Sequence, residues 1–200
     1  MFQAIPYYCV LAIESALNVI GVRLYEEPRH TVIDHVQDVE IRRYAPRTAA
    51  MVEFSSGVVD RNDAFRLLFG YIAGANAGSD RIAMTAPVEL QGERVAMTAP
   101  VQMSKGRMMF FLPAEYGVST APRPRDPRVQ IVAVPSEEIA VLRFTGLGGV
   151  SPLRQKQLLS GLIRSRWQAV GEPFMYYYDA PFALPFLRRN EAAVVVEERN

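Results

Sequence analysis

Hydrophobic and polar residues alternate along two stretches of this chain that lie ninety residues apart. Residues 50–54 read AMVEF and residues 140–144 read AVLRF, so apolar side chains recur at every second position. Because successive side chains of a β-strand point to opposite faces, each stretch predicts a strand with one face in the core. Strands are also predicted at residues 39–44 and 129–134, which precede these stretches at the same offset.

The offset continues along the chain, so the sequence predicts two similar halves, residues 38–113 and 126–198. Each half is expected to hold two strands, a helix and two further strands. The later strands are predicted at residues 88–90, 107–112, 174–178 and 192–197. Two helices cannot cover every face of a flat sheet, so the sheet is expected to curl. The predicted class is α+β, with a distorted antiparallel β-barrel of roughly 8–9 strands, two helices and a pseudo-twofold internal duplication.

The first helix is predicted over residues 62–73, with Asn62 as its N-cap. Apolar residues recur along it at three- and four-residue steps: Phe65, Leu68, Phe69 and Ile72. This spacing is typical of a helix with one apolar stripe.

The second helix has a clearer start signal. Ser151 is the expected N-cap, and Pro152 suits the first helical position because its missing N–H costs nothing there. Gly171 is predicted to end the helix in a left-handed conformation. The residues expected to be buried by this helix are Leu158, Leu159, Leu162, Ile163 and Trp167.

Residues 4–21 are mostly apolar, and their length approaches that of a membrane span. No Lys or Arg precedes them and no clear cleavage site follows, which argues against a secretory signal. Residues 1–24 are therefore predicted to form an N-terminal helix that docks on the domain or on a partner chain. The alternative is a membrane anchor. A cytoplasmic location is favoured over membrane anchoring.

Composition narrows the possible functions. The 22 Lys and Arg nearly balance the 21 Asp and Glu, and no basic run could follow a phosphate backbone, so nucleic acid is not an expected partner. One cysteine cannot form a disulfide framework or a Cys-rich metal cage. A nucleophile needs a base, and only His30 and His35 carry imidazoles. The sequence predicts no catalytic residue and assigns no metal ligand.

Three further features have both a structural and a ligand-binding interpretation. The boxes IAMTAPVEL (82–90) and VAMTAPVQM (95–103) are either edge segments or ligand contacts. The run YYYD at residues 176–179 either fills the core or lines a pocket. The run RRNE at residues 188–191 either guards a strand edge or clamps an anionic group.

Short motifs follow one another in order along residues 25–198. They are EIRRY (40–44), GYIAGAN (70–76), the two MTAPV boxes, FFLP (110–113), PRPRDPRVQI (122–131), RFTG (143–146), YYYDAP (176–181) and RRNE (188–191). Together these motifs resemble the SOUL family of haem-binding proteins. The combination is specific, although each motif alone is weak. The resemblance implies that residues 25–200 form a haem-binding domain, with the N-terminal helix outside it.

The resemblance also implies that haem or a related tetrapyrrole binds in a shallow apolar groove beside the first helix. The groove-facing residues carried over by position are Phe65, Phe69, Tyr71 and Ile72. Aromatic side chains suit a large flat ring that gains affinity by burying its faces.

Other members are expected to place basic residues near the haem propionates, where this chain has Gly70 and Leu184. The expected substitutes are Arg66, Arg188 and Arg189. Tyr176 and Tyr178 complete the predicted contact set.

Two alternatives to tetrapyrrole binding or transport remain. The chain could be a sensor or enzyme acting on another hydrophobic small molecule, with Tyr176, Tyr178 and Glu191 as acid–base candidates. It could also be an interaction module that contacts a protein or a membrane through residues 4–21.

Overall fold

The computed structural model describes residues 26–55, 59–78, 82, 88–91, 105–147, 151–179 and 184–199. The predicted N-terminal helix lies outside the described residues, and so does the Met-Thr-Ala-Pro centre of each box. None of the helices in these ranges combines the length and apolar character needed to cross a membrane.

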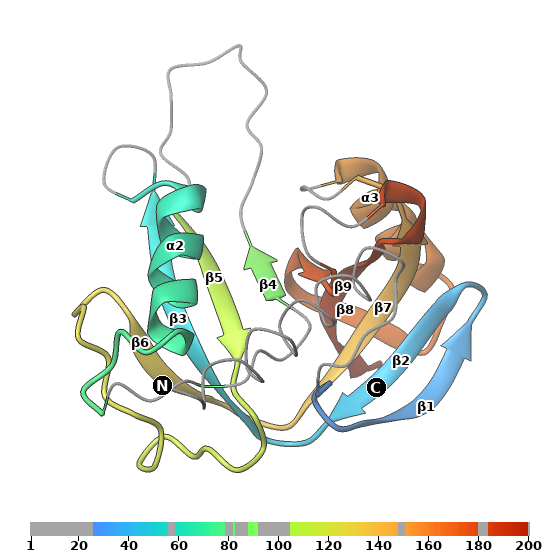
Figure 1. Cartoon of the computed structure of the whole chain (residues 1–200). Helices are drawn as coiled ribbons and strands as arrows, with labels where there is room; N and C mark the ends of the chain where they lie inside the picture. The colour runs from blue at the N-terminus through green and yellow to red at the C-terminus, as the bar shows by residue number, and fades with distance from the viewer. Residues whose placement is uncertain are drawn as a thin grey trace.

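Nine strands, two α-helices and a short 3-10 helix make up the described part of the chain. In chain order they are β1 (His30–Val36), β2 (Val39–Tyr44), β3 (Arg47–Ser55), α2 (Arg61–Ile72), β4 (Val88–Gln91), β5 (Lys105–Phe111), β6 (Gln130–Val134), β7 (Glu137–Thr145), α3 (Pro152–Leu162), β8 (Trp167–Tyr177), η1 (Pro185–Leu187) and β9 (Arg189–Glu198). The predicted α+β class is confirmed (Figure 1).

All nine strands belong to one antiparallel sheet, in the order β1-β2-β7-β9-β8-β4-β5-β3-β6. The predicted distorted barrel does not close, because within the described ranges the edge strands β1 and β6 do not pair with each other. β1 pairs with β2, and β6 pairs with β3. Among the described strands the sheet is therefore open, with β1 and β6 at its edges.

The strand order has a symmetry about the boundary between β4 and β8. Without β1, which has no counterpart, the order of the other eight strands reads the same from either end when β2, β3, β4 and β5 are exchanged with β6, β7, β8 and β9 respectively. The first strand of each half pairs with a strand of the other half, β2 with β7 and β6 with β3. An internal duplication stays a prediction from the sequence.

Buried side chains form one cluster under each helix and a third on the opposite face of the sheet. Alternation along β3 separates them, since Ala50 and Val52 pack under α2 while Ala49 faces the other way. Along β9, Val194 packs under α3 and Ala193 faces the other way. We call the face without helices the inner face. Its cluster consists of Tyr44, Ala49, Met109, Phe111, Val134, Ile139, Val141, Phe174, Tyr176, Tyr178 and Ala193.

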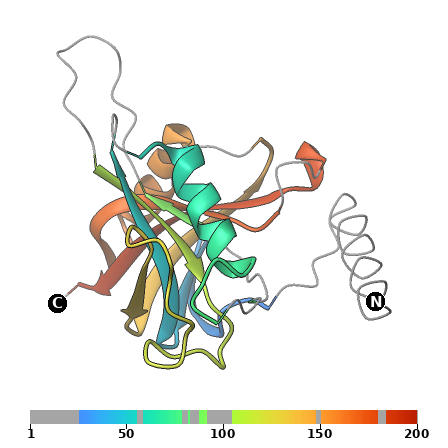
Figure 2. The same ribbon diagram turned by 60° about the vertical axis from the view of Figure 1, so that its left-hand side comes forward.

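The inner face curls around its own side chains. The Tyr176 ring of β8 lies 6.4 Å from the Tyr44 ring of β2 and 6.2 Å from the Phe111 ring of β5, measured between centroids. These strands are several places apart in the sheet, so such contacts require strong curvature. Figure 2 shows the resulting shape, with α2 lying across the outside of β3 and β5.

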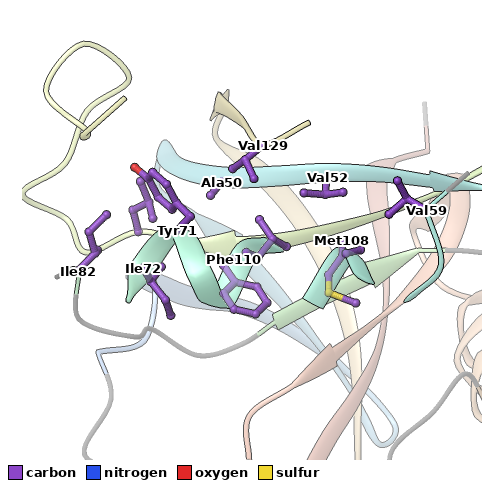
Figure 3. Close-up of a cluster of buried hydrophobic side chains, with 12 residues drawn as sticks. Ala50, Val52, Val59, Tyr71, Ile72, Ile82, Met108, Phe110 and Val129 are labelled. Carbon is purple, nitrogen blue, oxygen red and sulfur yellow. The ribbon is translucent and has the colours of Figure 1, made fainter. Parts of the chain in front are cut away.

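Helix α2 begins one residue earlier than the sequence predicts. Asp60 is the N-cap, and its Oδ1 accepts a hydrogen bond from the Asp63 backbone N–H at 2.7 Å. The prediction of Asn62 as the cap is wrong, because Asn62 lies within the first turn. The buried side of the helix carries Ala64, Leu68, Tyr71 and Ile72, which belong to the same buried cluster as Phe110. Figure 3 shows Tyr71, Ile72 and Phe110 in this cluster.

Helix α3 begins at Pro152 with Ser151 at the N-cap position, as predicted. It ends at Leu162, so the prediction that Gly171 ends it is wrong. Trp167 is buried, as expected, but it begins β8, where its indole Nε1–H donates to Asp34 Oδ2 at 2.7 Å. Gly171 has a φ of 81° and lies where the β8–β9 register shifts, so it serves an irregularity in a strand.

Candidate functional site

The exposed face of α2 carries two phenylalanines one turn apart. Leu68 and Ile72 of the same helix are buried, but Phe65 remains 36% exposed and Phe69 remains 47% exposed. Their rings are nearly parallel, with an interplanar angle of 12° and centroids 6.1 Å apart. The edge of this pair is anchored on the sheet, because Phe65 packs against Phe110 of β5 at 5.5 Å. The result is an apolar wall of parallel rings, which we call the α2 wall.

Arg66 follows Phe65 on the same helix and is well exposed, with 74% of its side chain accessible. Its guanidinium pairs with Asp63 one turn earlier. The pair lowers the pKa of Asp63, mainly through the hydrogen bond from Arg66. A positive charge therefore lies next to the α2 wall at the solvent-facing side.

Tyr71 and Ile72, the other two residues expected beside the groove, lie in the buried cluster under α2. The Tyr71 hydroxyl donates to the Pro122 carbonyl oxygen at 2.8 Å, which ties the end of the helix to the segment before β6. Burial raises the pKa of Tyr71 to about 12. The structure thus separates the four helix residues into an exposed pair of rings and a buried pair.

Two of the second-half candidates, Tyr178 and Arg189, meet at Glu191, whose side chain is fully buried. The Tyr178 hydroxyl donates to Glu191 Oε2 at 2.6 Å. Arg189 donates to Glu191 Oε1 through Nε at 2.9 Å and through Nη2 at 2.7 Å. Arg42 of β2 donates from Nη1 to Glu191 Oε2 at 2.9 Å. We call these four side chains the Glu191 network.

The pKa values of three side chains in this network are shifted from their ordinary values. Burial disfavours a charged Arg42, but Glu191 and Tyr44 together outweigh burial and raise the Arg42 pKa above its ordinary value. The pKa of Arg189 is raised by the same balance. Burial, reinforced by the negative charge of Glu191, raises the pKa of Tyr178 well above its usual value. Two guanidiniums and a neutral phenol therefore surround one carboxylate.

The remaining candidates are Tyr176 and Arg188, and Arg189 has further contacts besides its bonds to Glu191. Tyr176 is fully buried in the inner-face cluster, and the ring of Phe174 meets it edge-on at 5.1 Å. Arg189 also donates to Glu27 at 3.1 Å and lies over the Tyr178 ring at 3.9 Å. Arg188 follows η1 and is partly buried.

The nine candidate residues do not form one site. α2 packs on β3 and β5, whereas the Glu191 network lies on β2, on β9 and on the residue after β8. Figure 1 shows α2 on one side of the molecule and β8 and β9 on the other. Two hollows, of about 660 Å³ and 270 Å³, lie elsewhere on the protein, and none of the nine residues lines either of them.

Sequence reasoning did not connect Arg42 with Glu191. A signal for the connection is present, because Arg42 and Tyr44 occupy alternate positions of β2 and so share a face. An arginine on the same strand face as a buried tyrosine is itself expected to be buried. A buried guanidinium needs an acidic partner. The partner itself could not be named, since it lies 149 residues further along the chain.

The two histidines lie on β1, the edge strand at the end of the sheet order farthest from β3. His30 stacks at a tilt against Tyr44, with ring centroids 5.0 Å apart, and its Nδ1 lies 3.2 Å from the Pro28 carbonyl oxygen. His35 is exposed. Neither imidazole adjoins α2, which packs on β3 and β5.

The family model for the SOUL heme-binding protein family matches residues 25–195. The chain belongs to this family. Its expected ligand is therefore haem or another porphyrin. No curated protein matches the sequence.

Solved structures with the same fold are distant in sequence. The C-terminal domain of EcmrR has a TM-score of 0.54 at 13% identity and covers 80% of this chain and 97% of its own. A hydrolase from Listeria innocua has a TM-score of 0.57 at 11% identity, covering 82% of this chain and 94% of its own. An uncharacterized conserved protein from Listeria innocua has a TM-score of 0.55 at 10% identity, covering 88% and 95%. These likenesses show the shared fold alone.

Proposed function

We propose that this SOUL family protein binds haem or a related tetrapyrrole against the α2 wall. Family membership supports the class of ligand. The observation that supports the location is the pair of exposed, nearly parallel rings of Phe65 and Phe69. Large aromatic side chains are costly to leave in water, and a flat porphyrin face would cover both at once.

The residues present fit such a ligand. Phe65 is held by Phe110, so the wall is preorganised and little side-chain freedom is lost on binding. Arg66 places a guanidinium beside the rings, where it would pair with a propionate. When bound, the tetrapyrrole would supply its own redox or ligand-binding chemistry, while the α2 wall supplies position and apolar contact.

Titration of haem into the purified protein tests this proposal. Wild-type protein is expected to give a saturable shift of the Soret band. Removing both rings in the Phe65→Ala/Phe69→Ala variant should weaken haem binding about tenfold or more, because aromatic anchors commonly dominate such contacts. Phe69→Ala alone should show part of this loss without disturbing the contact between Phe65 and Phe110.

The matched control is Phe186→Ala, which truncates another exposed phenylalanine, 68% accessible, on η1. Its haem affinity should equal that of wild type. Thermal unfolding of each variant checks that the fold is retained. Equal affinities for the double variant and the control would overturn the proposed location, and an absent Soret shift in wild-type protein would overturn haem as the ligand.

A further inference from the structure

A hollow of about 660 Å³ lies at one end of the sheet, where the chain enters the described part of the fold. Its walls come from the residues before β1, the β2–β3 turn, the segment after β5 and the β6–β7 turn. Figure 1 shows the two turns at the same end of the sheet, and the Ser136 hydroxyl joins them by donating to the Tyr44 carbonyl oxygen at 2.8 Å. The hollow therefore has walls that are tied to the sheet.

The exposed part of the lining is mostly apolar. Six apolar side chains line the hollow at exposed positions: Ala45, Pro46, Ala114, Val118, Ala133 and Pro135. Leu112 and Val134 also line it and are buried, so the hollow is continuous with the core. Covering this surface removes apolar area from water, which favours an apolar occupant.

The charges at the hollow balance one another. Arg29 and Glu26 both line it at exposed positions. Arg47 also lines it, but its side chain is only 6% exposed and its Nη2 donates to Glu137 Oε2 at 3.1 Å. Two cations thus lie near two anions, so the hollow favours an occupant with little net charge.

The described part of the chain begins at the rim of this hollow. Glu26 is its first residue, and Glu26 Oε1 accepts from the Ala114 N–H, in the segment after β5, at 3.3 Å. The Arg29 carbonyl oxygen accepts from the Ala45 N–H, in the β2–β3 turn, at 3.2 Å. These two contacts fix residues 26–29 to two walls of the hollow, so the residues that precede Glu26 start from its rim.

Residues 4–21, which we call the N-terminal segment, have a composition that matches this surface. Apart from Glu14 their side chains are uncharged, and apolar residues recur among them at three- and four-residue steps. Five residue steps separate Gly21 from Glu26, so Gly21 stays within about 18 Å of the rim. A helix over residues 4–21 would be about 27 Å long. The N-terminal segment is therefore near enough and long enough to cover the hollow.

We propose that the N-terminal segment docks on this hollow within its own chain and covers it. The short connection gives the tethered segment an effective concentration on the order of millimolar, which favours it over a free partner of similar affinity. Closing so short a connection also costs little conformational entropy. The proposal is independent of the tetrapyrrole at the α2 wall, because no residue of α2 lines the hollow.

A spin label on the N-terminal segment tests where it lies. Cys9 is the single cysteine, so the Cys9→Ser/Ser15→Cys variant carries one nitroxide, at a position outside the apolar steps. In the whole chain this nitroxide should broaden the amide NMR signals of Ala45 and Ala114. The Leu147 signal should keep its intensity, because Leu147 follows the far end of β7, a strand that extends about 27 Å from the β6–β7 turn.

Two matched valine variants assign the docking surface. Val118→Asp places a charge in the lining, where the valine is 48% exposed, and should restore the broadened signals. Val170→Asp changes a valine that is 41% exposed on β8, outside the lining, and should leave them broadened. Chymotrypsin should cleave after Tyr7 and Tyr8 about tenfold faster in Val118→Asp than in Val170→Asp, because undocking must precede cleavage. Unfolding midpoints near that of wild type show that each variant is folded.

Three results would overturn the proposal. The first is an unbroadened Ala45 and Ala114 in the spin-labelled chain, or equal cleavage rates for the two valine variants. The second is broadening of these signals in an isotope-labelled chain without nitroxide that is mixed with spin-labelled chains, which would place the segment of a second copy in the hollow. The third is pelleting of the wild-type protein with vesicles of phosphatidylcholine and phosphatidylserine, which would show that a membrane holds the segment. Wild-type protein is expected to stay in the supernatant.

Discussion

Single residues decide how charge is held inside this protein. Glu191 is fully buried, and its carboxylate accepts hydrogen bonds from Arg42, Arg189 and Tyr178. A buried carboxylate is tolerated only when such partners replace water. The network joins β2, from the first half, to β9, from the second, so one side chain links strands that lie far apart in the sequence.

Replacing Glu191 with glutamine should therefore destabilise the protein strongly. The change keeps the shape of the side chain but removes the fully buried counter-charge between the two guanidiniums. Arg42 then keeps only Glu40 and Arg189 keeps only Glu27, both on the solvent side, so the cost is up to about 3–5 kcal/mol. Glu138→Gln is the matched control. It breaks the Arg43–Glu138 pair, whose arginine is 57% exposed, and should cost about 1 kcal/mol or less. Urea unfolding measures both, and similar losses for the two variants would contradict a stabilising role for the Glu191 network.

At the scale of the element, α2 shows how a capping residue and a buried stripe together set the direction of the α2 wall, the proposed ligand face. Asp60 sets the first turn, and the buried residues set the rotation of the helix about its axis. Phe65 and Phe69 are exposed because Ala64 and Leu68 occupy the positions that face the sheet. The α2 wall is therefore the apolar surface that remains exposed after the helix has packed.

The cap can be tested by paired substitutions. Asp60→Ala removes the carboxylate that accepts from the Asp63 N–H and should cost about 1 kcal/mol in the free energy of unfolding. Asn62→Ala lies in the first turn and should change stability by about 0.5 kcal/mol or less, as for most surface substitutions. Denaturant unfolding gives both values. A larger loss for Asn62→Ala than for Asp60→Ala would show that the helix starts at the later residue.

At the scale of the whole molecule, the two halves are joined through exchanged strands. β2 pairs with β7 over six residue pairs, and β6 pairs with β3 over five. Neither half therefore completes its share of the sheet without the other. The long-range pairing makes the whole sheet the unit of stability.

Cutting the chain tests this interdependence. Fragments 1–119 and 120–200 divide the protein in an exposed turn between the halves. Each fragment alone should show no cooperative unfolding, because each would expose a strand edge that the other normally covers. Mixing them should restore burial of Trp167, the single tryptophan, seen as a blue shift in its fluorescence. Cooperative unfolding of fragment 120–200 alone, with a buried tryptophan, would show that the second half is independent.

Sequence patterns predicted the helices and strands well where local periodicity or a capping residue determines them. The alternation at residues 50–54 and 140–144 corresponds to the observed β3 and β7, and Ser151 and Pro152 mark the start of α3. Gly171 misled the prediction, because a glycine suits the end of a helix and an irregular strand equally. Sequence alone also could not separate Phe65 and Phe69 from Leu68 and Ile72, since all four lie on one broad apolar side of the helix.

The sequence by itself determined the α+β class, most of the strands and the family, because periodicity, capping signals and motif order are local properties of the chain. Tertiary structure alone decided which apolar side chains stayed exposed on α2 and which charges met in the Glu191 network. It also decided that the nine described strands form an open sheet. These outcomes depend on contacts between residues far apart in the chain, and sequence spacing carries no direct record of such contacts.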